Sequence, residues 1–189
     1  GHIIGLSPEQ LASYRLAGIT TNHECISYEE AKEQVRNGIY VWIREGSAAH
    51  NLDAIVQGIV HNNANTEYYG FCTDDKHIED IEKEGHIDHN VRKAIKLGMD
   101  PIDAICMATI NSAKCYGLRR LGAVATGYQA DLLVLDDIEN MTIHDVYYNG
   151  QRIDQDSEIT VRECPAELKN TVHVGNFTVD DLTLESPDG

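Results

Sequence analysis

The stretch Tyr68-Tyr69-Gly70-Phe71-Cys72-Thr73-Asp74-Asp75 joins an aromatic, β-prone run to a pair of carboxylates. A helical pattern rich in Ile, Asp and Glu follows from about His77. Strand, acidic turn and helix in this order are typical of a βα unit, and βα barrels carry their reacting groups at the carboxyl ends of the strands. Asp74 is therefore predicted to stand at such a strand end, where the alternative role of an aspartate is to cap the next helix.

Two earlier strands end in polar residues in the same way. Ile19-Thr20-Thr21-Asn22 is followed by His23-Glu24, and Ile39-Tyr40-Val41-Trp42-Ile43 is followed by Arg44-Glu45-Gly46-Ser47. Ser7-Pro8-Glu9-Gln10 predicts the start of a helix before the first of these strands, with Ser7 as its N-cap. Helices are also predicted between the strands, because Ser27-Tyr28-Glu29-Glu30 is a capping box and a further helical pattern runs over about residues 51–60. Strands that alternate with helices indicate parallel βαβ units. Three polar ends in register favour an active-site rim over three separate helix caps.

The last third of the chain has a different character. Helical patterns continue beyond Asp75, and the last of them predicts a single helix from Asp100-Pro101 to about Gly117. Leu132-Leu133-Val134-Leu135 is then predicted to be a short buried strand. Asn149-Gly150 is the strongest type of two-residue hairpin signal. Two more β-prone runs follow, Ile159-Thr160-Val161 and Thr171-Val172-His173-Val174. The sequence thus predicts an α/β domain over residues 1–120 and a β-rich domain over residues 121–189.

Composition narrows the function classes. The 189 residues are 42% apolar and 24% charged, and the formal net charge of −16 argues against binding to nucleic acids or anionic membranes, which requires basic patches. No apolar run approaches the roughly 20 residues that span a bilayer, and no signal peptide opens the chain. The five cysteines are scattered without a Cys-x-x-Cys pair. Reduced thiols in a cytoplasmic protein are therefore expected.

Several stretches resemble adenine deaminases of the amidohydrolase superfamily. They are Gly1-His2 with Gly5-Leu6, residues 18–24, residues 43–49, Thr73-Asp74-Asp75, residues 84–89 and residues 122–135. The resemblance spans roughly residues 1–153. The pattern Gly-x-x-x-x-Gly-x-x-Ala-Asp-Leu at residues 122–132 is shared across the superfamily. Arg44-Glu45-Gly46-Ser47-Ala48 and Gly85-His86-Ile87-Asp88-His89 resemble adenine deaminases more particularly.

This resemblance implies the C-terminal part of a distorted (β/α)8 TIM-type barrel, followed by a β-sandwich segment. It also implies a site for two divalent metal ions, manganese or iron(II), with zinc as an alternative. In such enzymes the fifth and sixth barrel strands each supply a histidine, which match His2 and His23 here. The eighth strand supplies an aspartate, which matches Asp74.

The implied reaction is the hydrolysis of adenine to hypoxanthine and ammonia, in purine salvage. Metal ions lower the pKa of a bound water. Asp74 would accept a proton from that water and pass it to the leaving amine. Glu45 and Ser47, at the rim of the seventh strand, are candidates for reading the edge of the purine. Glu24 and Asp75 are candidates for orienting His23 and the water.

The chain also departs from the superfamily pattern. No His-x-His pair occurs in the 189 residues, and the acidic metal bridge from the middle of the barrel is absent. The expected partners are therefore adenine and the missing N-terminal portion of the barrel, in a homo-oligomer. Two alternatives stay open. One is another amidohydrolase acting on a cyclic amide such as a dihydropyrimidine, and the other is a non-catalytic fragment or subunit that keeps the fold.

Overall fold

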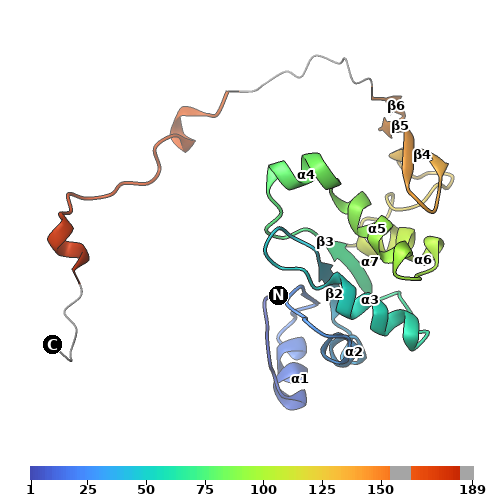
Figure 1. Ribbon diagram of the computed structural model, residues 1–189, viewed down its shortest axis with the longest axis horizontal. Coiled ribbons are helices and arrows are strands. Elements are labelled where there is room, and N and C mark those ends of the chain that lie inside the picture. Colours follow the sequence, from blue (N-terminus) through green and yellow to red (C-terminus); the bar gives the residue numbers. More distant parts are fainter. Residues whose placement is uncertain (154–162, 184–189) are drawn as a thin grey trace. The chain divides into compact units, whose positions relative to one another are not determined.

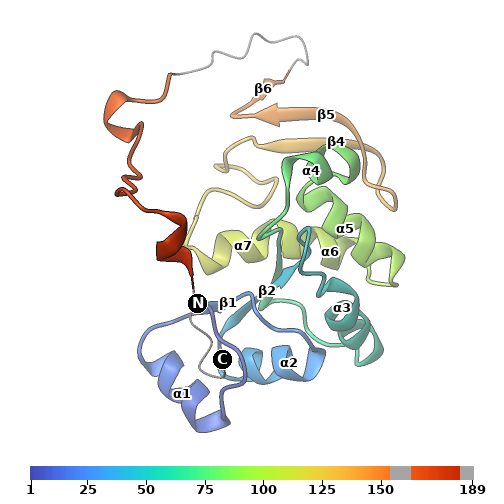
Figure 2. The same cartoon turned by 60° about the vertical axis from the view of Figure 1, so that its left-hand side comes forward.

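Three parallel strands form the first sheet of the computed structural model, which describes residues 1–153 and 163–183. They are β1 (Thr21–Asn22), β2 (Tyr40–Arg44) and β3 (Tyr69–Cys72), in the order β1-β2-β3. Asn22 lies opposite Val41, and Arg44 lies opposite Cys72. The strands β1 and β2 lie side by side (Figure 2). The predicted parallel βαβ arrangement is confirmed, and all three strands end at the same edge of the sheet.

Seven α-helices occupy the described part of the first 120 residues. They are α1 (Pro8–Leu16), α2 (Tyr28–Arg36), α3 (Leu52–His61), α4 (Ile78–Glu84), α5 (Ile87–Lys96), α6 (Pro101–Ala108) and α7 (Ile110–Cys115). The side chain of Ser7 caps α1 and that of Ser27 caps α2, as their sequences predict. The single helix predicted after Asp100 is instead two, because the backbone of Thr109 leaves the helical region between α6 and α7.

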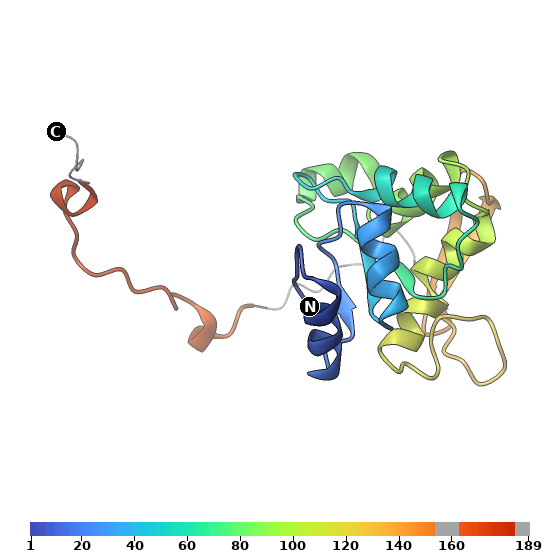
Figure 3. The same ribbon diagram turned by 90° about the horizontal axis from the view of Figure 1, so that it is seen from below.

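Alternation along β2 separates a core face from a site face. Val41 and Ile43 are fully buried and belong to a core cluster with residues of α2, α3 and α5. These three helices lie side by side along one side of the sheet (Figures 1 and 3). Trp42 and Arg44 lie on the opposite face, where the Trp42 ring stacks on Tyr116 with centroids 5.7 Å apart. Arg44 is thereby positioned on the site face, at the carboxyl end of β2.

A second sheet follows, with β4 (Leu132–Asp137), β5 (Thr142–Tyr148) and β6 (Gln151–Arg152) all antiparallel. Asn149 and Gly150 both have positive φ and connect β5 to β6, so the predicted hairpin is confirmed. The prediction that residues 132–135 are buried is wrong, since Leu133 is 49% exposed. A strand of this apolar composition is buried only where another layer covers it, and among the described residues such cover reaches Leu135 but leaves Leu133 and Val134 exposed.

Contacts divide the chain into residues 1–153 and residues 154–189. This division does not coincide with the predicted boundary after residue 120, because Leu135 and Met141 pack on the core cluster of the first sheet. Residues 163–183 contain only the 3-10 turns η1 (Ala166–Leu168) and η2 (Val179–Leu182). The strand expected over residues 171–174 is therefore wrong, and that over residues 159–161 lies outside the described residues. The described helices include none that could span a membrane.

Candidate active site and metal centre

Side chains from all three parallel strands meet at the carboxyl edge of the first sheet. His23 and Glu24 follow β1, Arg44 ends β2, and Asp74 follows β3 by two residues. Asp74 has a φ of 50°, in the left-handed region that non-glycine residues seldom adopt. Such backbone conformations persist where surrounding contacts enforce them, and they concentrate at functional sites.

Glu24 is the centre of this group. Its Oε1 atom lies 3.0 Å from Nδ1 of His2 and 2.9 Å from Nε2 of His23. The same His23 nitrogen lies 3.6 Å from Oδ1 of Asp74. The two imidazole rings meet edge to face, with centroids 5.5 Å apart. Four of the predicted site residues, His2, His23, Glu24 and Asp74, are thus brought together from three segments of the chain.

Asn22 holds the segment that carries His2. Its buried side-chain amide accepts a hydrogen bond from the backbone N–H of Ile3 at 3.1 Å and donates one to the Ile3 carbonyl at 3.2 Å. This paired bond fastens residue 3 to the last residue of β1 although 19 residues separate them. His2 is consequently placed beside His23 by β1 itself.

Arg44 lies in the site, although the sequence had assigned no role to this residue by itself. Its Nη1 donates to both carboxylate oxygens of Glu24, at 3.0 and 2.9 Å, and lies 3.6 Å from Oδ2 of Asp74. Nε of Arg44 donates to Oδ1 of Asn51 at 3.1 Å. The available signal was the alternation of β2, which puts Arg44 on the face of Trp42 and at the end of the strand.

Glu45 lies apart from this group and is buried in a separate network. Its Oε1 accepts from Nζ of Lys93 at 2.8 Å and faces Nδ1 of His50 at 3.0 Å, while Oε2 accepts from the backbone N–H of Leu52 at 3.3 Å. Burial of the Lys93 ammonium opposes its charge. Hydrogen bonds from Lys93 to Asp53 and Glu45 outweigh that effect and raise the pKa of the lysine. The Glu45 carboxylate therefore links β2 to α3 and α5.

Ser47 and Asp75 connect the loops that follow β2 and β3. The hydroxyl of Ser47 donates to Asp80 at 2.5 Å and accepts from the backbone N–H of His77 at 2.8 Å. Oδ2 of Asp75 accepts from the backbone N–H of Ala48 at 2.8 Å, and this bond holds the pKa of Asp75 below its usual value. Both side chains thus contact the neighbouring loop, and the contacts described for Asp75 do not include His23.

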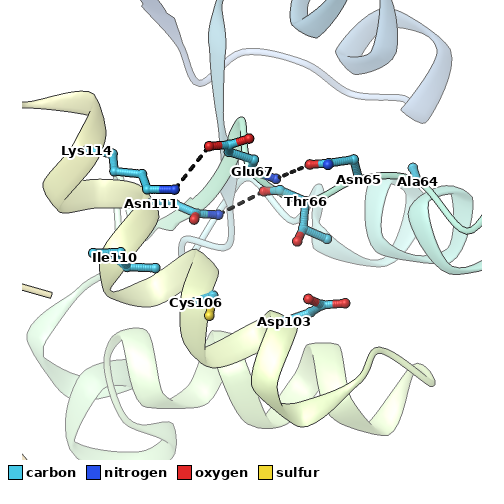
Figure 4. A pocket seen from close by; sticks show the side chains of 9 residues that line it. All are labelled: Ala64, Asn65, Thr66, Glu67, Asp103, Cys106, Ile110, Asn111 and Lys114. Atoms are coloured by element: carbon cyan, nitrogen blue, oxygen red, sulfur yellow. Dashed lines mark hydrogen bonds and ion pairs between the residues drawn. The ribbon is translucent and has the colours of Figure 1, made fainter. Parts of the chain in front are cut away.

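A polar pocket of about 390 Å³ lies at the other end of the sheet, next to the loop that precedes β3 (Figure 4). Nζ of Lys114 pairs with Glu67 at 3.0 Å, and the Asn111 amide donates to the carbonyl oxygens of Thr66 and Tyr69 at 2.8 and 3.0 Å. These bonds join α7 to the start of β3. In βα barrels the amino-terminal ends of the strands serve stability, and the chemistry lies at the opposite ends.

Residues 44–176 match the amidohydrolase family. The chain belongs to this family. It is 52% identical over 188 residues to an adenine deaminase of Desulfitobacterium hafniense, and 43% identical over 193 residues to one of Lysinibacillus sphaericus. An adenine deaminase of Clostridium acetobutylicum is 41% identical over 189 residues. These matches cover 98 to 100% of the chain but 33% of each relative. This amidohydrolase chain therefore spans about a third of the length of the curated relatives it matches.

Two solved structures agree on the fold. The chain is similar to a β-aspartyl dipeptidase of Fervidobacterium islandicum, with a TM-score of 0.59 and 15% identity over 80% of this chain and 45% of that one. It is also similar to phenylurea hydrolase B, with a TM-score of 0.52 and 23% identity over 81% of this chain and 43% of that one. At these identities the likeness shows the α/β barrel fold alone.

The donor set of this amidohydrolase fits a divalent metal ion. Two ligand atoms that each lie about 2.1 Å from one ion, at a tetrahedral angle, are about 3.4 Å apart. Nε2 of His23 and Oδ1 of Asp74 are 3.6 Å apart, and donor atoms of His2, His23 and Glu24 all lie within 4.8 Å of one another. Burial raises the pKa of the nearby Cys72 thiol to about 12, so a thiolate is not available there. Imidazole and carboxylate ligands suit manganese, iron and zinc.

Proposed function

We propose that this chain supplies part of the active site of an adenine deaminase, which hydrolyses adenine to hypoxanthine and ammonia. The observation that carries the proposal is the meeting of His2, His23, Glu24 and Asp74 at one sheet edge, in a chain that is 41 to 52% identical to curated adenine deaminases. The substrate is inferred from the relatives, and the hydrolytic chemistry is inferred from the group of side chains.

His2 and His23 would hold a metal ion together with Asp74. When bound, that ion lowers the pKa of water, so that a nucleophile exists near neutral pH. Asp74 accepts one proton from the attacking water and delivers it to the amino group at C6 of adenine. The water oxygen bonds to C6, the C6–N bond breaks and ammonia leaves, and the second proton of the water ends on ring nitrogen N1 of hypoxanthine. Glu24 accepts from Nδ1 of His2 and so leaves Nε2 of that ring to bind the ion.

Glu45 and Ser47 are proposed to read the edge of the purine. Support for this comes from their position on the loop that follows β2, next to the Arg44 end of that strand. In the present arrangement the Ser47 hydroxyl is shared between Asp80 and the backbone of His77. Contact with adenine would require Ser47 to exchange one of these partners for the ligand. Asp75 is proposed to act by fixing the same loop through Ala48.

Further parts of the proposal concern the complete enzyme. It would hold two metal ions, manganese or iron(II), with zinc as an alternative, and would assemble as a homo-oligomer. Residues 1–120 would be the closing part of a (β/α)8 barrel, and residues 121–189 would belong to a β-sandwich. Exposed apolar side chains on β4 and β5, such as Leu133 and Val146, support a covering layer from the rest of the protein. The complete enzyme would act in purine salvage. It would do so in the cytoplasm, in keeping with five free cysteines.

The test is an assay of the full-length enzyme, in which the remaining barrel strands are present. Manganese- or iron(II)-loaded protein is expected to convert adenine to hypoxanthine with one ammonia released per purine, as measured by chromatography and an ammonia assay. A dihydropyrimidine is the comparison substrate. Turnover of the dihydropyrimidine and not of adenine would replace the proposal with the cyclic-amide alternative. Absence of both activities in metal-loaded, folded protein would support a non-catalytic role.

A further inference from the structure

Arg44 occupies the middle of the site without a part in the reaction described above. Its side chain is 12% exposed and that of Glu24 is 6% exposed, so this ion pair is largely removed from water. One guanidinium nitrogen contacts both oxygens of Glu24 and also faces Asp74. Arg44 therefore lies between the carboxylates that follow β1 and β3.

Glu24 competes with a metal ion for the same nitrogen. Its Oε1 lies 2.9 Å from Nε2 of His23, which is also the nitrogen that faces Asp74. Once that nitrogen binds a metal it can no longer donate a hydrogen bond to Glu24. The carboxylate must then either withdraw from His23 or become a metal ligand itself, since its oxygen lies within reach of the same ion.

The contacts of Arg44 favour withdrawal. Hydrogen bonds between a guanidinium and a carboxylate are short and strong, and they neutralise the charge that would attract a cation. Asn51 fixes the arginine, because its side-chain oxygen accepts from Nε of Arg44 and its backbone N–H donates to the Arg44 carbonyl at 3.0 Å. An anchored guanidinium can hold the Glu24 carboxylate against itself and away from the metal, while His23 turns its lone pair to the ion.

We propose that Arg44 is a positioning residue that keeps Glu24 out of the coordination shell of the metal. Glu24 then remains a hydrogen-bond acceptor for His2, and Asp74 remains the carboxylate that contacts the ion. This inference rests on the proposed metal-dependent function, but its test does not require adenine. A lysine should replace Arg44 poorly, because an ammonium is a point charge without the planar fork that Asn51 and Glu24 engage.

The experiment loads cobalt(II) into the full-length enzyme and into its R44M, R44K and R44M/E24Q variants. R36M is the matched control, because Arg36 is 67% exposed and pairs only with Glu33 among its described contacts. In R44M the visible absorption spectrum of cobalt is expected to change to that of an ion with a higher coordination number, because Glu24 joins the ion. Loss of the nearby positive charge should tighten metal binding about tenfold, and kcat should fall about 10- to 100-fold.

Each variant gives a separate outcome. The R44M/E24Q spectrum should return to that of the unmodified enzyme, because a neutral amide is a poor ligand, and R36M should match it throughout. An unchanged cobalt spectrum in R44M, or a change that persists in R44M/E24Q, would overturn the inference. Full activity in R44K would show that charge alone suffices and would overturn it as well. If R44M does not fold, N51A tests the same point, since it frees Nε of Arg44 and should shift the spectrum in the same direction.

The two proposals fail in different ways. If the enzyme does not turn over adenine but R44M changes the cobalt spectrum as expected, the role of Arg44 stands and the proposed substrate is wrong. If adenine is deaminated and the cobalt spectrum of R44M is unchanged, the proposed function stands and the role of Arg44 is wrong.

Discussion

Asp74 and Asp75 are adjacent in the sequence, but they have separate partners in the structure. Asp74 contacts His23 and Arg44 at the strand edge, with its backbone in the left-handed region. Asp75 turns to the loop that follows β2 and accepts the N–H of Ala48. Asp74 thus belongs to the group of side chains at the strand edge, and Asp75 holds a loop beside it.

The variants D74N and D75N should therefore differ in activity. D74N is expected to lower kcat by about 10³-fold or more in the full-length enzyme, because an amide cannot accept the proton and is a poor metal ligand. D75N is expected to cost about tenfold, since its amide oxygen can still accept from Ala48. Steady-state kinetics with saturating metal would measure both. Equal losses, or a larger loss in D75N, would mean that the roles of the two acids are reversed.

At the scale of elements, Glu45 and Lys93 join β2 to α5 across 48 residues. Glu45 is 3% exposed, so the loss of its cationic partner would leave a carboxylate with little access to water. His50 and the N–H of Leu52 still contact that carboxylate, which moderates the effect. The ion pair therefore contributes to stability, whatever contact Glu45 makes with a substrate.

K93M is expected to lower the free energy of unfolding by about 2–3 kcal/mol at pH 8, measured with urea. The double variant E45Q/K93M should cost less than the sum of the single changes, because neither charge is left alone. The pKa of Lys93 is raised above 10.5 in the folded protein. Its stabilisation is therefore complete below that pH and is lost as the pH rises through the higher folded value. A cost that does not shrink at strongly alkaline pH would contradict this account.

Close contact between β3 and β2 depends on Gly70. A Cβ atom at this position would lie 1.8 Å from the ring of Trp42, which is itself buried. G70A is expected to destabilise the protein by about 1–3 kcal/mol, because the ring and its stacked neighbour Tyr116 must move. Urea unfolding would measure the change. G175A is the matched control, since no atom lies within 4 Å of the added carbon, and it should stay within about 0.5 kcal/mol of the unmodified protein.

At the scale of the whole molecule, the three-stranded sheet is a partial barrel. Within the described residues, β1 and β3 each pair with β2 alone, so each has an edge without a partner strand. Unpaired edges of this kind promote association between chains. The sequence also lacks the His-x-His pair that completes the metal site of the superfamily it resembles. We therefore propose that further barrel strands of the complete protein pair with these edges and supply the remaining metal ligands.

Residues 1–189 expressed alone are therefore expected to be inactive. The chain should bind manganese or iron(II) weakly, self-associate on size-exclusion chromatography and release no ammonia from adenine above background. Co-expression with the remaining barrel should restore a defined assembly and activity. Metal-dependent turnover by the chain alone within about tenfold of the full-length enzyme, equivalent to about 1.4 kcal/mol in barrier, would contradict this prediction.

The sequence by itself determined the features that depend on neighbouring residues. Ser7 and Ser27 cap their helices, and Asn149-Gly150 makes its hairpin, because these preferences arise within a few residues of backbone. The polar ends of three strands also predicted the edge at which His23 and Asp74 meet. Parallel strands that are joined by helices must end on the same side of a sheet, so this conclusion follows from their order alone.

Only the tertiary structure decided which polar groups contact one another. Arg44 meets Glu24 across 20 residues, and Glu45 meets Lys93 across 48, through the register of the sheet and the packing of α5. No local pattern separates Glu24, which joins the site, from Glu45, which is buried in a separate network with Lys93 and His50. The sequence also could not predict the exposure of Leu133, because the burial of a strand depends on whether another layer covers it. Contacts and burial are sums over distant segments, whereas caps and turns are properties of a short stretch of chain.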